Sequence, residues 1–388
     1  MKAAIDALLR PKTFLSSTRS RIVASAVVLV ALLAVGVTAL EFGSKGAAPK
    51  VRTIIETPVG IVHAGSAAGA VLISGSGSTF AQPFLAAALP YYAENNPVAV
   101  SYNPTGSGTG IKQFTNNQTD FGVSDTPMNA AQLLAANGNG SGVLQLPILL
   151  GGEAVIYNLD LPASTQLRMD GPTLAAIFMG KITNWDDPAL ATLNPGVHLP
   201  NMPITTVHRS DGSGTTYIFT DYLSKASTDF QLNVGPGLTV PWPGGAGESG
   251  NLNVANYVLH HTGSIGYVEL KFALDNKLSY MNMKNAAGNY VVPSSASILA
   301  AADQYPGVTA TNFSITNAPG ANSYPITGYS WALVRALHSH VSKGKALIEL
   351  FEWLTTAGQS YAGQLNYVPL PDFVRAESLK TLQGLHLL

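Results

Sequence analysis

Three short turns rich in Gly, Ser and Thr separate strand-like runs from helix-like runs in this chain of 388 residues. The turns lie at 75–80 (GSGSTF), 105–110 (TGSGTG) and 208–216 (HRSDGSGTT). The first two follow short apolar runs at 71–74 and 98–102, and all three precede a segment with helical periodicity. Strand, turn and helix repeated in this order predict βαβ units, and therefore an α/β fold with a mixed, mostly parallel sheet.

The same patterns predict the elements of the remaining chain. Helices are expected to follow the first two turns, as far as residues 95 and 114. Further strands are predicted at 120–124, 143–150, 153–159, 203–208, 265–268, 278–283 and 328–334, and further helices at 171–179, 214–225, 250–261, 342–357 and 371–385.

The first forty residues have the pattern of a targeting segment outside the fold. A cluster of basic residues precedes 22–40, an apolar run without any charged residue, and this order directs export. The length of the run fits either a cleaved signal peptide, with VTA at 37–39 as the cleavage site, or a retained membrane anchor. Small residues and Gly at 41–70 predict a flexible linker, which leaves 71–388 for the folded body.

Composition excludes several classes of protein. Charged residues make up 11% of the chain, the net charge is -1, and hydrophobic residues reach 46%. Such a chain can bury a large core, unlike a disordered polyampholyte, and it offers little positive charge for nucleic-acid phosphates. The absence of Cys excludes disulfides, thiolate metal sites, cysteine nucleophiles and a lipid-modified N-terminal Cys.

The chemistry of the three turns suits an anion. A helix start leaves backbone N–H groups unpaired and carries a partial positive charge, so three converging starts would bind an oxyanion. For one turn alone, helix capping is the simpler interpretation, and Thr79 with Gln82 fits a capping box. The turns match no Walker A sequence, dinucleotide fingerprint or nucleophile elbow, and the eight His residues form no metal signature.

At these residues the chain resembles the periplasmic phosphate-binding protein of the high-affinity phosphate ABC transporter. The resemblance extends over 71–388 and is most specific in the Arg-x-Asp-Gly-Ser-Gly-Thr stretch of the third turn. It implies a two-lobed solute-binding fold with chain crossings near 151–158 and 322–329. Lobe I would comprise 71–154 with 325–388, and lobe II 155–324. Matching segments include DFGVSDTPM at 120–128, GKITNWDDPAL at 180–190, SIGYVEL at 264–270 and YPITGYSWALV at 324–334.

The resemblance implies four phosphate contacts from the first lobe. Thr79 and Phe80 would donate backbone N–H groups, with the Thr79 hydroxyl as a further donor. Ser107 would supply its hydroxyl and N–H, and Asp125 would accept a hydrogen bond from the protonated ligand. Without the resemblance, the simpler interpretation of Asp125 is a cap at the end of a strand.

The second lobe would supply five more residues. Arg209 would make the charged contact, and Asp211 would pair with its guanidinium group and orient it. Ser213, Gly214 and Thr215 would donate from the start of a helix. The simpler interpretation of Arg209 and Asp211 is a surface ion pair, which contributes little to stability.

The resemblance implies a non-enzymatic extracytoplasmic receptor. It would close on inorganic phosphate and deliver it to the permease subunits of an ABC transporter, as a monomer without a cofactor or metal. Two alternatives stay open. One is an exported phosphatase, which needs a nucleophile–base pair or a two-metal cluster. The other is a surface adhesion or signalling protein with the same fold.

Overall fold

The computed structural model describes residues 61–63, 69–140, 142–162 and 164–387. The predicted targeting segment, its cleavage site and most of the predicted linker lie outside these residues. Among the helices of the described residues, none has both the length and the apolar character needed to cross a membrane.

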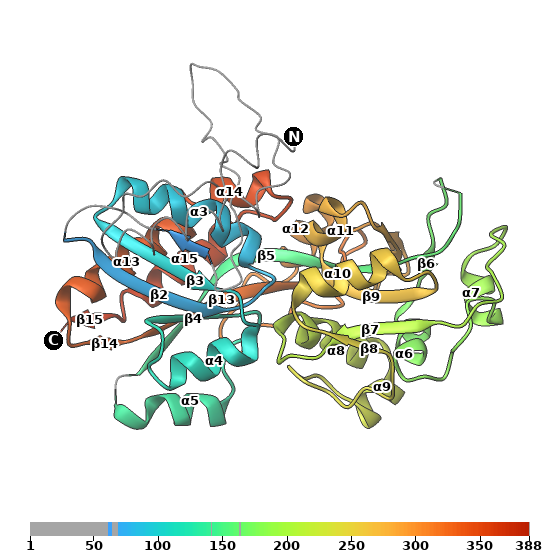
Figure 1. Ribbon diagram of the computed structural model, residues 1–388, viewed down its shortest axis with the longest axis horizontal. Coiled ribbons are helices and arrows are strands. Elements are labelled where there is room, and N and C mark those ends of the chain that lie inside the picture. Colours follow the sequence, from blue (N-terminus) through green and yellow to red (C-terminus); the bar gives the residue numbers. More distant parts are fainter. Residues whose placement is uncertain (1–60, 64–68, 141, 163, 388) are drawn as a thin grey trace, which may run out of the picture. The chain divides into compact units, whose positions relative to one another are not determined.

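A mixed sheet of ten strands organises the described residues (Figure 1). Parallel pairs join β2 to β3 and β4, and β7 to β8 and β9, as the strand–turn–helix units predict. The edge strand β1 is antiparallel to β3, and the central strands β13 and β5 are antiparallel to their neighbours. In order along the sheet the strands are β1 (Ile61–His63), β3 (Val98–Asn103), β2 (Val71–Gly77), β4 (Phe121–Ser124), β13 (Thr327–Arg335), β5 (Val143–Tyr157), β9 (Ser264–Glu269), β7 (Thr205–Arg209) and β8 (Ala246–Glu248), with β10 (Ser279–Tyr280) paired beside β5.

Strand β5 belongs to both halves of this sheet. Its residues 143–152 pair with β13, and its residues 153–157 pair with β9. We call β1, β2, β3, β4, β13 and residues 143–152 the first half-sheet. Residues 153–157 with β9, β7 and β8 form the second half-sheet.

The sequence pattern predicts two strands, at 143–150 and 153–159, where the structure has the single strand β5. The prediction of a break was wrong because Gly151 and Gly152 are extended residues inside the ladder. A Cβ at Gly151 would lie 2.7 Å from the Phe80 ring, and a Cβ at Gly152 would lie 2.8 Å from Ile298. The two glycines therefore make room for side chains packed on opposite faces of β5.

The predicted long helices are confirmed, and they pack on the sheet. Around the first half-sheet, α3 (Gln82–Asn95) contacts β3, α4 (Ser107–Thr115) contacts β2 and β4, and α13 (Val341–Thr355) and α15 (Asp372–Leu382) contact β5. Around the second half-sheet, α10 (Gly250–His260) contacts β9 and β7, and α6 (Gly171–Phe178) packs on α8 (Gly214–Ala226).

Short elements complete the described chain. The predicted strand at 278–283 is divided into two, because Met281 lies between β10 and the next strand. The short helices are α5 (Ala130–Ala136), η1 (Asn137–Asn139), α7 (Pro188–Leu193), α9 (Thr228–Asn233), α11 (Leu270–Asp275), α12 (Ser295–Ala302) and α14 (Gln359–Gln364). The short strands are β6 (Arg168–Met169), β11 (Asn282–Lys284), β12 (Tyr290–Val291), β14 (Leu337–His338) and β15 (His386–Leu387).

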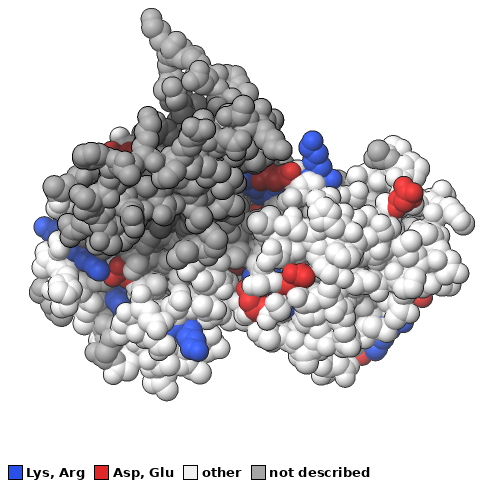
Figure 2. Space-filling view, viewed as in Figure 1, with Lys and Arg blue, Asp and Glu red and all other residues white. Residues whose placement is uncertain are grey.

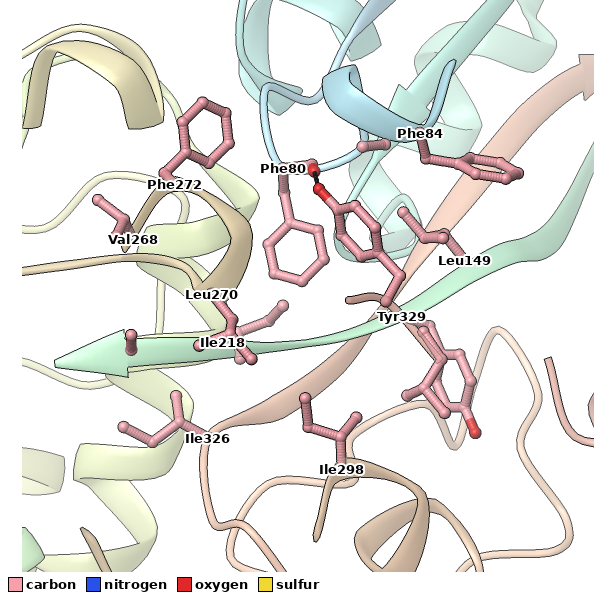
Figure 3. Close-up of a cluster of buried hydrophobic side chains, with 14 of the residues drawn as sticks. Phe80, Phe84, Leu149, Ile218, Val268, Leu270, Phe272, Ile298, Ile326 and Tyr329 are labelled. Carbon is pink, nitrogen blue, oxygen red and sulfur yellow. Dashed lines mark hydrogen bonds between the residues drawn. The ribbon is translucent and has the colours of Figure 1, made fainter. Parts of the chain in front are cut away.

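The core is continuous across both half-sheets and rich in aromatic side chains. Trp331 on β13, Tyr267 on β9 and Phe219 on α8 are among its fully buried members. In Figure 3, Phe80 lies on one side of β5 and Ile298 on the other, and Leu270 and Phe272 of α11 belong to the same core. The visible surface of the described residues is mostly uncharged (Figure 2), in keeping with the composition.

Candidate anion-binding site

The three turns follow strands of the two half-sheets and lead into helices, as predicted. Strand β2 leads to α3, β3 leads to α4, and β7 leads to α8. Asp125 follows the end of β4, which is parallel to β2, so it lies at the same edge of the sheet as the first turn. The carboxyl ends of such strands are where open α/β sheets bind ligands.

The second and third turns are in direct contact. The Gly108 N–H donates to the Gly212 carbonyl across 2.7 Å. A Cβ on Gly214 would lie 2.5 Å from the Cβ of Asp125 and 2.6 Å from the Ser107 hydroxyl. Only glycine at 214 allows this approach, so the sequence itself permits the start of α8 to reach the first half-sheet.

Asp125 is the centre of a hydroxyl cluster in the first half-sheet. Its Oδ1 accepts hydrogen bonds from Ser78, at 2.5 Å, and from Ser330, at 2.6 Å, while its Oδ2 accepts from Ser107 at 3.3 Å. Burial raises the pKa of Asp125 to about 6, although these hydrogen bonds and the charge of Arg209 favour the ionised form. Asp125 is therefore a buried hydrogen-bond acceptor near neutral pH.

Arg209 and Asp211 form a bidentate pair in which Arg209 is buried and Asp211 is partly buried, not the surface pair of the simpler interpretation. The Arg209 Nε donates to Asp211 Oδ1 at 2.7 Å, and a terminal nitrogen of its guanidinium group donates to Oδ2 at 2.5 Å. The other terminal nitrogen donates to the Thr215 hydroxyl at 3.3 Å. This geometry fixes the guanidinium plane at the start of α8 and reduces its net field.

The Thr79 side chain links the first turn to α10, which packs on the second half-sheet. Its hydroxyl oxygen accepts hydrogen bonds from the side-chain amide of Asn251, at 2.9 Å, and from the Asn251 backbone, at 3.3 Å. The predicted capping box at Thr79 was therefore wrong, since α3 begins at Gln82 and no side chain caps it. Instead the Ser78 hydroxyl accepts from the N–H of Ala81 at 3.1 Å.

The start of α8 has donors that point away from the helix body. The Ser213 hydroxyl oxygen caps α8 by accepting from the Thr216 N–H at 3.1 Å, and the Ser213 N–H donates to the Leu238 carbonyl at 2.8 Å. The first-turn amides of Gly214 and Thr215 have no intrahelical acceptor. A serine hydroxyl that accepts a hydrogen bond can still donate its own proton. The Ser213 hydroxyl and the backbone amides of Gly214 and Thr215 can therefore donate to a ligand.

Phe80 contributes its backbone at this edge and its ring to the core. Its carbonyl accepts a hydrogen bond from the Tyr367 hydroxyl at 2.6 Å, which holds the first turn in place. The ring is fully buried. The buried ring and the hydrogen-bonded carbonyl together fix the position of the Phe80 peptide N–H.

Sequence comparisons place the chain in a family. Residues 62–357 match the PBP superfamily domain. The phosphate-binding protein PstS of Xylella fastidiosa is 44% identical over 303 residues, which cover 78% of this chain and 82% of that protein. The corresponding protein of Pasteurella multocida is 42% identical over 307 residues, with coverages of 78% and 87%. The chain belongs to the PstS phosphate-binding protein family.

A solved structure shares the fold of this PstS-family chain. The crystal structure of a phosphate binding protein from Stenotrophomonas maltophilia is 20% identical and superposes with a TM-score of 0.63, covering 80% of this chain and 94% of its own. The resemblance seen in the sequence and the predicted periplasmic-binding-protein fold are thereby confirmed.

Three residues of the candidate site were not predicted from the sequence. Ser78 lies inside the first turn, but its carboxylate partner is far along the chain. Ser330 is a hydroxyl within a fully buried strand, a position that requires a partner and could have been noticed for that reason. Asn251, by contrast, contacts Thr79 and Thr215 only through the tertiary fold, and no sequence pattern marks it.

Proposed function

We propose that this chain captures inorganic phosphate between two lobes and delivers it unchanged to the permease of a phosphate ABC transporter. The observation that carries the proposal is the position of Asp125 and Arg209, one at each side of the contact between the turns. Family membership supports the same function, since relatives at this level of identity are named phosphate-binding proteins.

The arrangement suits phosphate in particular. Arg209 and the helix starts attract any tetrahedral oxyanion. Asp125 accepts hydrogen bonds, and phosphate near neutral pH carries at least one proton that it can donate. The ligand contacts that we propose are Thr79, Phe80, Ser107, Asp125, Arg209, Ser213, Gly214 and Thr215, with Asp211 as the residue that orients Arg209.

Hinge closure between lobe I (71–154 and 325–388) and lobe II (155–324) would enclose the ligand. Strand β5 changes its partner from β13 to β9 between Gly152 and Glu153, which supports one crossing there. The second crossing would lead into β13. Contacts between the turns then belong to the closed state.

The receptor would act outside the cytoplasmic membrane, after export by its N-terminal segment. Cleavage and retention of that segment lead to different mature chains. Mass spectrometry of the native protein distinguishes them: an N-terminus near residue 40 indicates cleavage, and an intact N-terminus in the membrane fraction indicates an anchor. A full-length chain in the cytoplasm would contradict both.

Calorimetric titration of the purified protein with phosphate, sulfate, arsenate and molybdate tests the ligand class. We expect phosphate to bind and sulfate to bind far more weakly. Binding of sulfate or molybdate alone would overturn the proposal.

Binding without chemical conversion is part of the proposal. The hydroxyls of Ser78 and Ser107 are hydrogen-bonded to a carboxylate that serves as a ligand acceptor, which supports a binding role for them. A phosphomonoester assay with added divalent metal checks this inference. Turnover that disappears in Ser213→Ala would show a phosphatase instead.

A further inference from the structure

Glu153 is a buried acid that the proposed function does not use. It lies where β5 changes partner from β13 to β9, and its side chain is fully buried. Both backbone polar groups of Glu153 are hydrogen-bonded. Its N–H donates to the Ile326 carbonyl at 2.9 Å, and its carbonyl accepts from the Tyr324 hydroxyl at 2.6 Å. Within the described part of the chain, neither carboxyl oxygen of Glu153 has a hydrogen-bond partner.

A second buried acid lies directly opposite. Glu269 on β9 is the register partner of Glu153, and it is also fully buried. Directly opposed residues of an antiparallel pair share a face of the sheet, with Cβ atoms about 5 Å apart. Glu269 caps α11, since its Oε2 accepts from the Lys271 N–H at 2.9 Å. Glu153 has no such donor in the described residues.

The face of β5 that carries Glu153 is the face toward the candidate site. Side chains two residues apart in a strand point the same way, so Glu153 shares the face on which a Cβ at Gly151 would meet Phe80. Phe80 follows Thr79, which is hydrogen-bonded to Asn251 on α10. Opening of the proposed cleft would separate the first turn from α10, and we take this opening as the step that admits water to Glu153.

Charged and titratable groups reach Glu153 from several elements. Burial raises the pKa of Glu153 well above its ordinary value; Asp125 after β4 and Glu269 on β9 act in the same direction, and Arg209 on β7 acts against them. Tyr267 on β9 and Tyr324 before β13 also lie within electrostatic reach, and burial raises the pKa of both tyrosines, so they stay neutral.

We propose that Glu153 takes up one proton when the protein closes on phosphate, so that ligand binding and protonation of this residue are coupled. The inference rests on the proposed phosphate function. In the open state, hydrated Glu153 is a carboxylate; on closure it binds a proton from solvent and becomes a neutral carboxylic acid. The cleft thereby gains one positive charge as the anion brings its negative charge.

The physical reason is the cost of the alternative. An ionised carboxylate without a donor in a dry interior is strongly unfavourable, and an incoming anion makes it more so. At a pH between the open-state and closed-state pKa of Glu153, closure therefore requires the proton. Because the closed state has the higher pKa, phosphate binding through this residue weakens as pH rises, by at most about tenfold per pH unit for one proton.

Calorimetry of the full protein between pH 5.5 and 8.5, each pH in two buffers of different ionisation enthalpy, measures the protons taken up per phosphate bound. We expect Glu153→Gln to take up fewer protons than the wild type, by as much as one, and its dissociation constant to rise less steeply with pH. Ionisation of phosphate contributes equally to both proteins. Glu352→Gln, the same change at an exposed position, should behave as the wild type.

Equal proton uptake by the wild type and Glu153→Gln would overturn the inference while leaving the phosphate function intact. A wild type that binds no phosphate would instead overturn the function. If proton uptake falls in Glu269→Gln and not in Glu153→Gln, the proton goes to Glu269 and the assignment to Glu153 is wrong.

A measurement on the wild type covers the case in which Glu153→Gln does not fold. Infrared difference spectra with isotopically labelled Glu should show the C=O stretch of a protonated glutamic acid appearing when phosphate is added at pH 7. The isotope shift separates this band from Asp125. No labelled band, or one already present without phosphate, would contradict the proposal.

Discussion

At the scale of single residues, we assign the attraction of oxyanions and the discrimination between phosphate and sulfate to different side chains of the candidate site. Arg209 supplies the positive charge and is held by Asp211, so it does not choose among oxyanions. Asp125 is saturated on one oxygen by Ser78 and Ser330, and its other oxygen has only the longer bond from Ser107. In the proposed function, that second oxygen accepts the hydrogen bond from the protonated ligand.

Asp125→Asn is expected to narrow the preference for phosphate over sulfate, mainly by raising sulfate affinity. Sulfate has no proton to donate to a carboxylate, whereas an amide N–H₂ can donate to sulfate.

Arg209→Ala should weaken the binding of phosphate and of sulfate together, by about 3 kcal/mol, roughly a hundredfold in the dissociation constant. Competition titrations at pH 7 and fixed salt measure both. An unchanged ratio in Asp125→Asn would restore the interpretation of Asp125 as a structural cap.

Asp125 should also make the stability of the unliganded protein depend on pH. Its pKa is raised to about 6 from an ordinary value of 3.8. A raised carboxyl pKa stabilises the folded state at low pH, and this contribution disappears as pH rises through about 6. The wild type should lose about 3 kcal/mol of unfolding free energy relative to Asp125→Asn between pH 3.5 and 7. Urea unfolding at several pH values measures the difference, and a constant difference would exclude this titration.

The residues of the site differ in how far the sequence reveals them. The turn residues were predictable because Gly, Ser and Thr between a strand and a helix have a local physical meaning. The partners of Asp125 and Thr79 were not, because Ser330 and Asn251 reach them through pairings between distant segments. Glu153 follows two glycines that suggest a strand end, and only the continuous ladder of β5 reveals it as a buried residue.

At the scale of elements, the approach of α8 to the first half-sheet depends on a missing side chain. Gly214→Ala is expected to abolish most phosphate binding while leaving the circular dichroism spectrum unchanged. The new Cβ would lie within 2.6 Å of both Asp125 and Ser107, and both belong to the buried site. Gly307→Ala is the matched control, since a Cβ there meets no atom within 4 Å. Full binding by Gly214→Ala would show that the turns need not touch in the liganded state.

At the scale of the whole molecule, the proposed function assigns closure and selectivity to different groups. Asn251 joins the Thr79 hydroxyl, at 2.9 Å, to the Thr215 hydroxyl, at 3.2 Å, and so connects the first turn with the start of α8. Both contacts are with protein groups. We therefore expect Asn251 to act on the equilibrium between the proposed open and closed states.

Asn251→Ala should lower the binding affinities for phosphate and sulfate by the same factor, roughly tenfold, since buried hydrogen bonds contribute about 1–2 kcal/mol. The competition titration used for Asp125→Asn measures it, with thermal unfolding as a check on folding. A change in the ratio of the two affinities would mean that Asn251 contacts the ligand.

The order of strands in the sheet has a consequence for how the protein is made. Strand β13 lies between β4 and β5, with Trp331 paired to Ser124 on one side and to Pro147 on the other. Because synthesis proceeds from the N-terminus, the facing edges of β4 and β5 stay unpaired until residues 327–335 of β13 have been made. Unpaired strand edges promote aggregation. A product that stops before Thr327 would lack the centre of its first half-sheet and is expected to be degraded or to aggregate.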